Sequence, residues 1–327
     1  MDLTFHTLDV FTDRTFGGNP LGVFPDATHL PTELMQRIAL EMNLSETVFL
    51  GPPESGGDAR VRIFTPGREV PFAGHPTVGS AIYLASRLDA RELDDALDAD
   101  GSGTMTLLLE ENVGPVPVVV RFEAGRPVFA RFTTAILPEH RPSPHAAAEL
   151  AAMVGLAESD VGGTLDGTTL EPEMVSCGLE YFVIPIRTLD AIRRAALDTA
   201  RWRTMLADAW ADHVYLVCLE TEGAGVDLHV RMFAHGAGVP EDPATGSAAA
   251  ALGGYFSMVD GREEAELSWT VEQGLEIGRP SLIQVEADRA GGATSAVRVG
   301  GAAVPVSHGT MSVPDADRGR KARRADP

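Results

Sequence analysis

The chain has 327 residues, 44% of them hydrophobic and 22% charged, and this ordinary composition predicts a folded protein large enough for two lobes. Its formal net charge of −21 would repel a phosphate backbone, so nucleic-acid binding is disfavoured and no nucleic-acid partner is expected. An anionic ligand would need a local positive field, which helix N-termini can supply without lysine or arginine.

The cysteine content and the N-terminus bear on where the protein works. Two cysteines, Cys177 and Cys218, are too few for a disulfide framework and form no Cys-x-x-Cys motif, so we expect reduced thiols in a cytoplasmic protein. The N-terminus carries acidic residues and no basic region of the kind that opens a signal peptide. No uninterrupted apolar run approaches the roughly 20 residues of a membrane-spanning helix, so no membrane partner is expected.

The first part of the chain is predicted to alternate short strands with two helices. Strands are expected at 3–10, 21–24, 45–50 and 61–65, with a Gly/Pro turn at 17–20 and helices at about 32–42 and 77–88. Thr32 is the expected N-cap of the first helix, because a threonine hydroxyl often accepts a hydrogen bond from the first turn. Short strands separated by turns follow from about 104 to 132.

The second part mixes helices and strands and ends in a strand-rich region. Helices are expected near 146–154, 188–206 and 247–256, strands at 181–186, 214–219 and 228–233, and further strands over 267–311. We predict an N-terminal lobe over 1–130, with strands in 295–312 as candidates to complete it, and a C-terminal lobe over 131–294. The tail 313–327 lacks an apolar face and is expected to be disordered.

The most informative feature is an internal repeat. The segment VRIFTPGREVPFAGHPTVGSA at 61–81 matches VRMFAHGAGVPEDPATGSA at 230–248 at ten positions, once two residues are skipped in the second copy. Convergence of two strand–turn–helix units on similar turn chemistry is the alternative explanation, and we favour an internal duplication.

The repeat makes His75 and Asp242 equivalent. Proline is favoured at the first helical position, so the residue before each proline, His75 or Asp242, is the expected N-cap of the helix that follows. Two lobes related by an approximate two-fold axis would aim both helix N-termini into one cleft. Their free N–H groups would then form an anion site that needs no basic side chain.

Three side chains are candidates for acid/base chemistry. His75 can exchange a proton near neutral pH, and Asp242 can hold a proton or orient a partner; the alternatives are a loop histidine without a role and a simple helix cap. Glu46 opens a predicted strand, where glutamate is uncommon. It is either a solvated strand end or a partly buried carboxyl group whose raised pKa suits a general acid and base.

At these residues the chain resembles the PhzF-like family of phenazine-biosynthesis isomerases. The resemblance is carried by FTDRTFGGNPLGVF (11–24), NLSETVFL (43–50), RIFTPGREVPFAGHPTVGSA (62–81), EDPATGSAAAALGGYF (241–256) and QGLEIGRPS (273–281). It implies an α+β fold of two pseudo-symmetric lobes, each a barrel-like, mostly antiparallel sheet around a central helix, as in diaminopimelate epimerase. It also implies a homodimer.

The resemblance further implies roles for individual residues. Glu46 would shuttle a proton within a ring substrate without metal or organic cofactor, and His75 and Asp242 would hold the substrate and its protons. Backbone groups of the two helix starts would bind the substrate carboxylate. The substrate-binding residues we assign on this basis are Gly74, Pro76, Thr77, Thr245, Gly246 and Ser247.

We therefore predict a cofactor-independent isomerase that moves a proton within a small carboxylate-bearing substrate; the alternative is a non-catalytic binding or interaction protein on the same fold. Nucleotide-dependent enzymes, zinc hydrolases and serine hydrolases are disfavoured, because the sequence lacks their glycine-rich loops, His-Glu-x-x-His and Gly-x-Ser-x-Gly. A two-cysteine racemase is disfavoured too, because neither Cys177 nor Cys218 lies at a predicted helix N-terminus.

Overall fold

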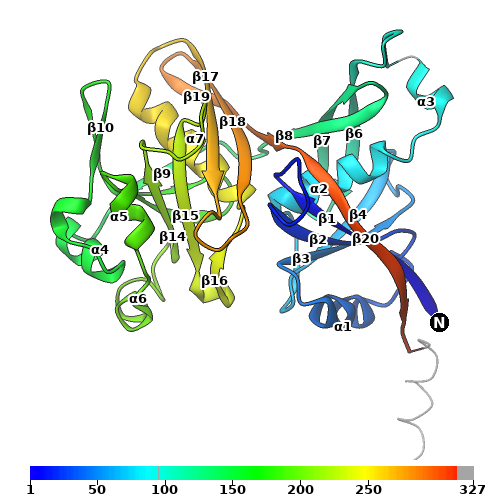
Figure 1. The fold of residues 1–327 in the computed structure, drawn as a ribbon, viewed down its shortest axis with the longest axis horizontal. Helices are drawn as coiled ribbons and strands as arrows, with labels where there is room; N and C mark the ends of the chain where they lie inside the picture. The colour runs from blue at the N-terminus through cyan, green and yellow to red at the C-terminus, as the bar shows by residue number, and fades with distance from the viewer. Residues whose placement is uncertain (95, 315–327) are drawn as a thin grey trace, which may run out of the picture. The chain divides into compact units, whose positions relative to one another are not determined.

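The computed structural model describes residues 1–94 and 96–314, and the chain divides into two compact units (Figure 1). Unit 1 contains residues 1–16, 20–130 and, from the end of the chain, 302–314; unit 2 contains 17–19 and 131–301. The tail expected to be disordered lies outside the described residues from 315 onward. Val313, however, is buried and donates a backbone hydrogen bond of 2.8 Å to Met1 O, so the expectation of disorder is wrong at this residue.

Unit 1 is a mostly antiparallel sheet with three helices. The strands that lie wholly or mostly in it are β1 (Asp2–Val10), β2 (Asn19–Phe24), β3 (Glu46–Gly51), β4 (Ala59–Phe64), β5 (Glu69–Val70), β6 (Gly103–Glu111), β7 (Gly114–Glu123), β8 (Arg126–Thr133) and β20 (Ala303–Ser312). Its helices are α1 (Thr32–Met42), α2 (Gly74–Ala85) and α3 (Ala90–Asp94). Strand β2 runs parallel to β3, and β4 runs parallel to β6.

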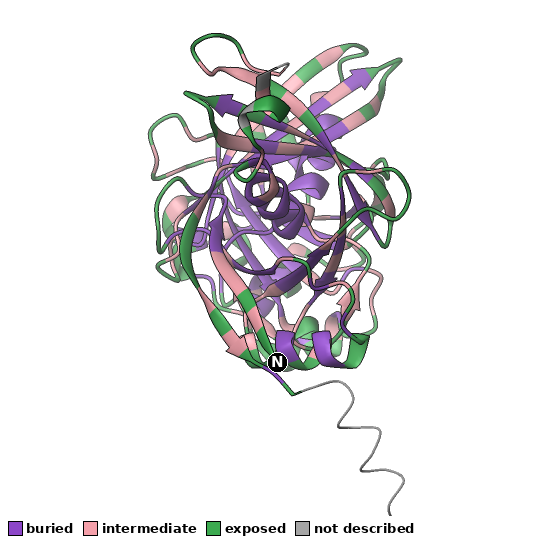
Figure 2. Cartoon of the chain, turned by 90° about the vertical axis from the view of Figure 1, so that its right-hand side faces the viewer, coloured by how far each residue is buried: buried purple, intermediate pink, exposed green. Residues whose placement is uncertain are grey.

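The helix α2 is the centre of unit 1. All of its residues except Leu84 are buried, and it packs against β1, β3, β6, β7 and β20. Figure 2 shows buried helical turns enclosed by strands whose outer residues are exposed. Gly79 allows this close packing, because a Cβ atom there would lie 2.5 Å from Leu21 Cδ2 and 2.8 Å from Val10 Cγ2. On the outer side of the sheet, α1 covers a second apolar cluster that includes Phe24, Phe49 and Phe64.

Unit 2 repeats this plan with more elements. Its strands are β9 (Glu139–Pro142), β10 (Gly163–Leu165), β11 (Thr168–Leu170), β12 (Glu173–Ser176), β13 (Glu180–Pro185), β14 (His213–Cys218), β15 (Leu228–Ala234), β16 (Val239–Asp242), β17 (Ala265–Gln273), β18 (Ser281–Ala290) and β19 (Ala293–Gly301). Its helices are α4 (Ala147–Met153), α5 (Leu189–Arg194), α6 (Thr199–Met205) and α7 (Gly246–Asp260), with short 3-10 helices at Glu158–Asp160 and His235–Ala237.

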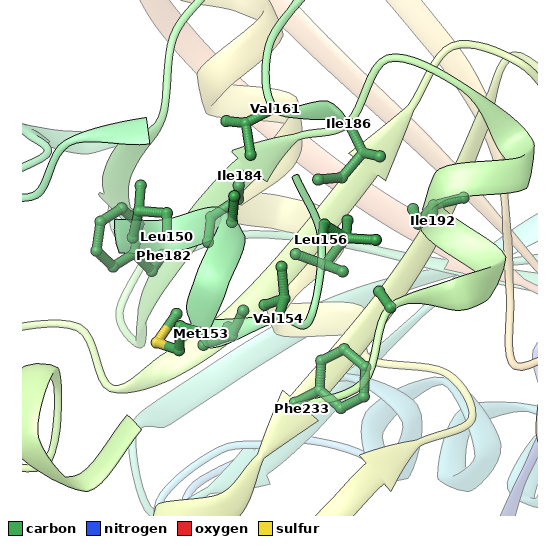
Figure 3. Close-up of a cluster of buried hydrophobic side chains, with 14 of the residues drawn as sticks. Leu150, Met153, Val154, Leu156, Val161, Phe182, Ile184, Ile186, Ile192 and Phe233 are labelled. Carbon is green, nitrogen blue, oxygen red and sulfur yellow. The ribbon is translucent and has the colours of Figure 1, made fainter. Parts of the chain in front are cut away.

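The helix α7 has the central place in unit 2 that α2 has in unit 1. It is buried over most of its length and packs against β12, β13, β17, β18 and β19. A separate apolar cluster joins α4, α5 and α6 to strands β13, β14 and β15; Figure 3 shows Leu150, Phe182, Ile192 and Phe233 within it. The predicted class, two lobes with a barrel-like sheet around a central helix, is therefore confirmed.

The strand pairing confirms the internal repeat. In unit 1, β4 runs antiparallel to β3 and parallel to β6, with Ala59 opposite Leu109. In unit 2, β15 runs antiparallel to β14 and parallel to β17, with Leu228 opposite Val271. The offset between Ala59 and Leu228 is the one that relates the two sequence copies, so equivalent residues occupy equivalent sheet positions.

Several local expectations are wrong. Thr32 is the first residue of α1 rather than its cap, which is Pro31, and its hydroxyl accepts a hydrogen bond of 3.0 Å from Arg62 Nη2. The helix expected over 188–206 is two short helices, because Asp198 starts a new one by accepting hydrogen bonds from the N–H groups of Ala200 and Arg201.

Among the described residues, no helix is both long and apolar enough to cross a bilayer.

Candidate active site

Glu46 is the first residue of β3, a strand that packs against α1. It lies opposite Leu21 of the parallel neighbour β2, and the four residues that follow it are buried. Its own side chain is 19% exposed, so the carboxyl group is partly buried rather than fully solvated. The alternative of a solvated strand end is therefore wrong, since solvent reaches only a small part of this group.

His75 lies in the first turn of α2 and is 4% exposed. Burial lowers the pKa of His75 to about 3, so the imidazole is neutral at physiological pH. Its Nε2 atom is 3.4 Å from Glu46 Oε2, and no hydrogen bond to this nitrogen is formed by the described residues. The structure thus brings together two predicted site residues as a carboxyl group facing a neutral imidazole.

The predicted caps are displaced from the true helix starts. The cap of α2 is Ala73, and His75 is the second helical residue, because a proline fits anywhere in a first turn that lacks intrahelical N–H partners. Gly74, Pro76 and Thr77 belong to the same buried turn. This turn presents backbone N–H groups, as an anion site requires.

A second cluster forms around Asp242 in unit 2. Asp242 is the last residue of β16 and not the cap of α7, which is Thr245. Its Oδ1 accepts a hydrogen bond of 3.1 Å from Asn19 Nδ2, and its Oδ2 accepts one from the Thr245 hydroxyl. Gln273 Nε2 donates to Asp242 O at 2.8 Å and to Thr245 Oγ1 at 3.0 Å. These contacts hold Asp242 extended and delay the helix to Gly246.

The first turn of α7 completes this cluster. Gly246 and Ser247 are its first two residues, and Ser247 Oγ lies 2.6 Å from the Tyr181 hydroxyl on β13. The Asp242 cluster therefore offers N–H groups at a helix start, one carboxylate and a Tyr–Ser pair. The expectation that this cluster and the Glu46–His75 pair share one cleft stays a prediction.

The sequence did not lead us to four residues that contact the predicted site residues: Asn19, Gln273, Tyr181 and Glu111. Asn19 and Gln273 lie inside segments that carry the family resemblance, so the signal was present in FTDRTFGGNPLGVF and QGLEIGRPS. Glu111, which lies 2.7 Å from Thr77 Oγ1, had the same signal as Glu46, a glutamate in a predicted strand. Tyr181 had none, because its partner is distant in sequence.

The described residues offer little support for metal-dependent or thiol-based catalysis. No group of three or more histidine, cysteine or acidic side chains is placed to hold a metal ion in the part of the chain that the structure describes. Both cysteines are free thiols, and burial raises the pKa of Cys177 to about 12 and also raises that of Cys218. Neither thiol is suited to act as the base of a two-cysteine racemase.

Comparison with known proteins defines the class first. The fold is that of a hydroxyproline epimerase from Agrobacterium vitis, which is 11% identical, has a TM-score of 0.58 and covers 96% of this chain and 94% of its own. A phenazine biosynthesis protein of the PhzF family from Bacillus anthracis is closer, with a TM-score of 0.81 and 28% identity over 96% of this chain and 100% of its own. The protein therefore has the diaminopimelate-epimerase-like fold that these structures share.

The family follows from the sequence comparisons. The family model for phenazine biosynthesis-like proteins matches residues 8–309, and the chain belongs to this family. An uncharacterized isomerase of Mesorhizobium japonicum is 42% identical over 93% of this chain and 97% of its own length. The trans-2,3-dihydro-3-hydroxyanthranilate isomerase of Pseudomonas aeruginosa is 35% identical over 90% of this chain and 94% of its own.

Proposed function

We propose that this isomerase moves a proton within a small carboxylate-bearing substrate and that Glu46 is its general acid and base. The observation that carries the proposal is the partly buried Glu46 carboxyl group 3.4 Å from the neutral, buried imidazole of His75. A carboxylate can accept a proton from one substrate atom and return it to another, so the enzyme ends in its starting state.

The surroundings of Glu46 support this role. His75 stays neutral at working pH, so it can hold or orient a proton without forming a fixed ion pair that would keep Glu46 ionised. Asp242 is held by donors on both oxygens, which suits a carboxylate that positions substrate rather than one that exchanges protons.

The substrate carboxylate is the second element of the proposal. We assign its binding to the backbone N–H groups of Gly74, Gly246 and Ser247 at the starts of α2 and α7, with Pro76, Thr77 and Thr245 shaping these turns. A helix start offers oriented donors and a favourable dipole, so the acidic chain can bind an anion without a lysine or arginine. The reaction is proposed to need no metal or organic cofactor, and the enzyme to work as a cytoplasmic homodimer.

Proton exchange tests the proposal directly. The protein is incubated in D2O with a panel of cyclic and amino-acid carboxylates, including trans-2,3-dihydro-3-hydroxyanthranilate, and deuterium uptake is followed by mass spectrometry. Glu46→Gln is compared with Glu41→Gln, an exposed glutamate on α1. Uptake that is lost only in Glu46→Gln supports the proposal; uptake that survives in Glu46→Gln overturns it.

The alternative is a binding protein that keeps the fold without catalysis. It predicts carboxylate binding that is unchanged by Glu46→Gln, with no uptake of deuterium from D2O into any compound. Isothermal titration with the same panel separates the two functions, and light scattering in solution tests the homodimer.

A further inference from the structure

Glu111 is a buried carboxyl group that the proposed mechanism does not use. It is the last residue of β6, is 5% exposed, and its Oε1 lies 2.7 Å from the hydroxyl of Thr77 in the first turn of α2. Its Oε2 is buried and has no hydrogen-bond partner among the described residues. An ionised carboxylate here would leave a charged oxygen unpaired, which is costly.

The two contacts of the Thr77 hydroxyl are best satisfied when Glu111 carries a proton. The Thr77 hydroxyl also lies 2.8 Å from Ala73 O, in addition to its contact with Glu111. A hydroxyl has one proton to donate, and neither a carbonyl oxygen nor an ionised carboxylate can donate one. Both short contacts are satisfied when Glu111 is protonated, donates to Thr77, and Thr77 donates to Ala73 O.

The equivalent position in unit 2 is occupied by a residue that always donates. The register that pairs Ala59 with Leu109 and Leu228 with Val271 makes Glu111 the counterpart of Gln273. Gln273 Nε2 donates to the Thr245 hydroxyl at 3.0 Å, and Thr245 donates to Asp242 Oδ2. The donor–hydroxyl–acceptor chain is thus the same in both units if Glu111 carries a proton.

The electrostatic surroundings favour the protonated acid. Burial raises the pKa of Glu111 to about 8, and the positive charge of Arg60 opposes this effect only in part. Arg60 donates its hydrogen bonds to other groups, namely Val61 O at 2.9 Å, Glu110 O at 2.5 Å and the side chain of Asn112. The other titratable or charged groups on β6 and on the elements packed against it are Arg62 on β4, His75 and Tyr83 on α2, Glu110 on β6, and Arg121 and Glu123 on β7.

We propose that Glu111 is a positioning residue that works as a neutral carboxylic acid, donating a hydrogen bond to Thr77 and so fixing the first turn of α2. That turn carries His75, whose Nε2 faces Glu46 at 3.4 Å. An ionised Glu111 would also add negative charge to the turn assigned to the substrate carboxylate. This effect on the reaction rests on the proposed function; the protonation of Glu111 does not.

Protonation is tested first, without any activity measurement. Infrared spectra of the wild-type protein in D2O are expected to contain a carboxylic acid C=O band at pH 7 that disappears around pH 8 and is missing from Glu111→Gln. The neighbouring Glu110→Gln is the control and should keep the band, because three backbone N–H groups bind that carboxylate and lower its pKa. Identical bands in wild type and Glu111→Gln would overturn the proposal.

Stability gives an independent readout. The folded pKa of Glu111 lies above the unfolded one, so the folded state holds an extra proton between them, and stability is lost as pH rises toward about 8. Glu111→Gln cannot ionise and should remove this part of the pH dependence of the unfolding midpoint, whereas Glu110→Gln should leave it in place. An unchanged pH profile in Glu111→Gln would contradict the assignment.

Kinetics then tests the positioning role. In the wild type KM is expected to rise several-fold as pH passes about 8, while Glu111→Gln keeps a low KM across the same range. If Glu111→Gln does not fold, Thr77→Val serves instead: the protonated acid loses its hydrogen-bond acceptor, so the midpoint of the infrared band should move to lower pH. A midpoint that does not move, or moves up, counts against the proposal. If neither the wild type nor any variant exchanges deuterium with a substrate, the result counts against the proposed function and not against the protonation of Glu111.

Discussion

The two central helices begin in the same kind of hydrogen-bond chain, but the chains differ in their first and last members. In unit 2 the amide of Gln273 donates to Thr245, which donates to Asp242. In unit 1 Glu111 contacts Thr77, which contacts Ala73 O. The unit 2 chain ends on the carboxylate of Asp242, whereas the unit 1 chain starts from the carboxyl group of Glu111 and ends on a backbone carbonyl. With the proposed proton on Glu111, the donor order is the same in both units and only the unit 2 chain contains a charged group.

The same contrast appears one residue earlier along these strands. Glu110 accepts from the N–H groups of a loop in unit 1, and its counterpart Glu272 does so in unit 2. The basic residue that contacts each glutamate differs, however. Arg60 donates to the backbone oxygen of Glu110 in unit 1, and His229 contacts the Glu272 carboxylate in unit 2. Unit 2 thus has a titratable cation where unit 1 has a permanent one.

The largest expected effect is on kcat and KM, and it distinguishes the residue proposed to transfer the proton, Glu46, from the residue proposed to position the substrate, Asp242. Glu46→Gln should lower kcat by about 10²–10⁴-fold with little change in KM, because general acid/base catalysis contributes on this scale. Asp242→Asn should mainly raise KM, because Asp242 is held by donors and proposed to position substrate. Steady-state kinetics on the substrate found by deuterium exchange checks both. A KM effect for Glu46→Gln and a kcat effect for Asp242→Asn would reverse the assignment.

The next effect compares two arginines that the repeat makes equivalent. Arg231 is bound by Glu241 and by the carbonyl oxygens of Ile192 and Ala195, and its side chain is 8% exposed. Arg231→Gln leaves Glu241, whose side chain is only 11% exposed, without its ion-pair partner and should lower the unfolding free energy by about 3–5 kcal/mol.

Arg62 is the matched control for Arg231. It pairs with Glu69 in the same bidentate way, but its side chain is 17% exposed and it contacts Thr32 instead of buried carbonyl groups. Arg62→Gln should therefore cost only about 1 kcal/mol or less. Urea unfolding of both variants measures the difference, and equal costs would show that the deeper burial of Arg231 contributes nothing.

How far the sequence could predict this molecule is clear from particular residues. The strands and both central helices follow from hydrophobic patterning, and the repeat predicted correctly that equivalent residues occupy equivalent sheet positions. The repeat failed at the helix starts, because Gly74–Pro76 is helical in unit 1, whereas in unit 2 the strand β16 continues to Asp242, which Asn19 and Gln273 hold. Such contacts join residues far apart in the chain, so no local pattern could reveal them.

A smaller effect tests how closely α2 is packed. A Cβ atom on Gly79 would meet Leu21 Cδ2 at 2.5 Å and Val10 Cγ2 at 2.8 Å, so Gly79→Ala should lower the unfolding free energy by about 1–3 kcal/mol. Gly67→Ala, where the nearest atom would be 3.9 Å away in a polar turn, is the control. Thermal unfolding of both variants measures the costs. A neutral Gly79→Ala would mean that Leu21 can move aside without loss.

The smallest expected effect is the pH-dependent stability contributed by His229, which takes the place of Arg60 in unit 2. His229 lies between Glu272, 2.8 Å from Nδ1, and Glu276, 2.9 Å from Nε2. Burial works to lower the pKa of His229, but the hydrogen bonds and charges of Glu276 and Glu272 outweigh it and raise the pKa above the usual 6.5. The folded state therefore binds this proton more tightly than the unfolded state. Its stabilising contribution is complete below about pH 6.5 and is lost as pH rises through the folded value.

This loss can be isolated in the Glu111→Gln background, where the other buried titration is absent. The unfolding midpoint should then fall with rising pH above 6.5, and His229→Gln should flatten that dependence while lowering the midpoint at pH 6. Arg60→Gln should lower the midpoint by a similar amount at every pH, because a guanidinium stays charged throughout this range. A pH slope that persists in His229→Gln would show that another group titrates, and the contrast between a permanent and a titratable cation would then lose its physical basis.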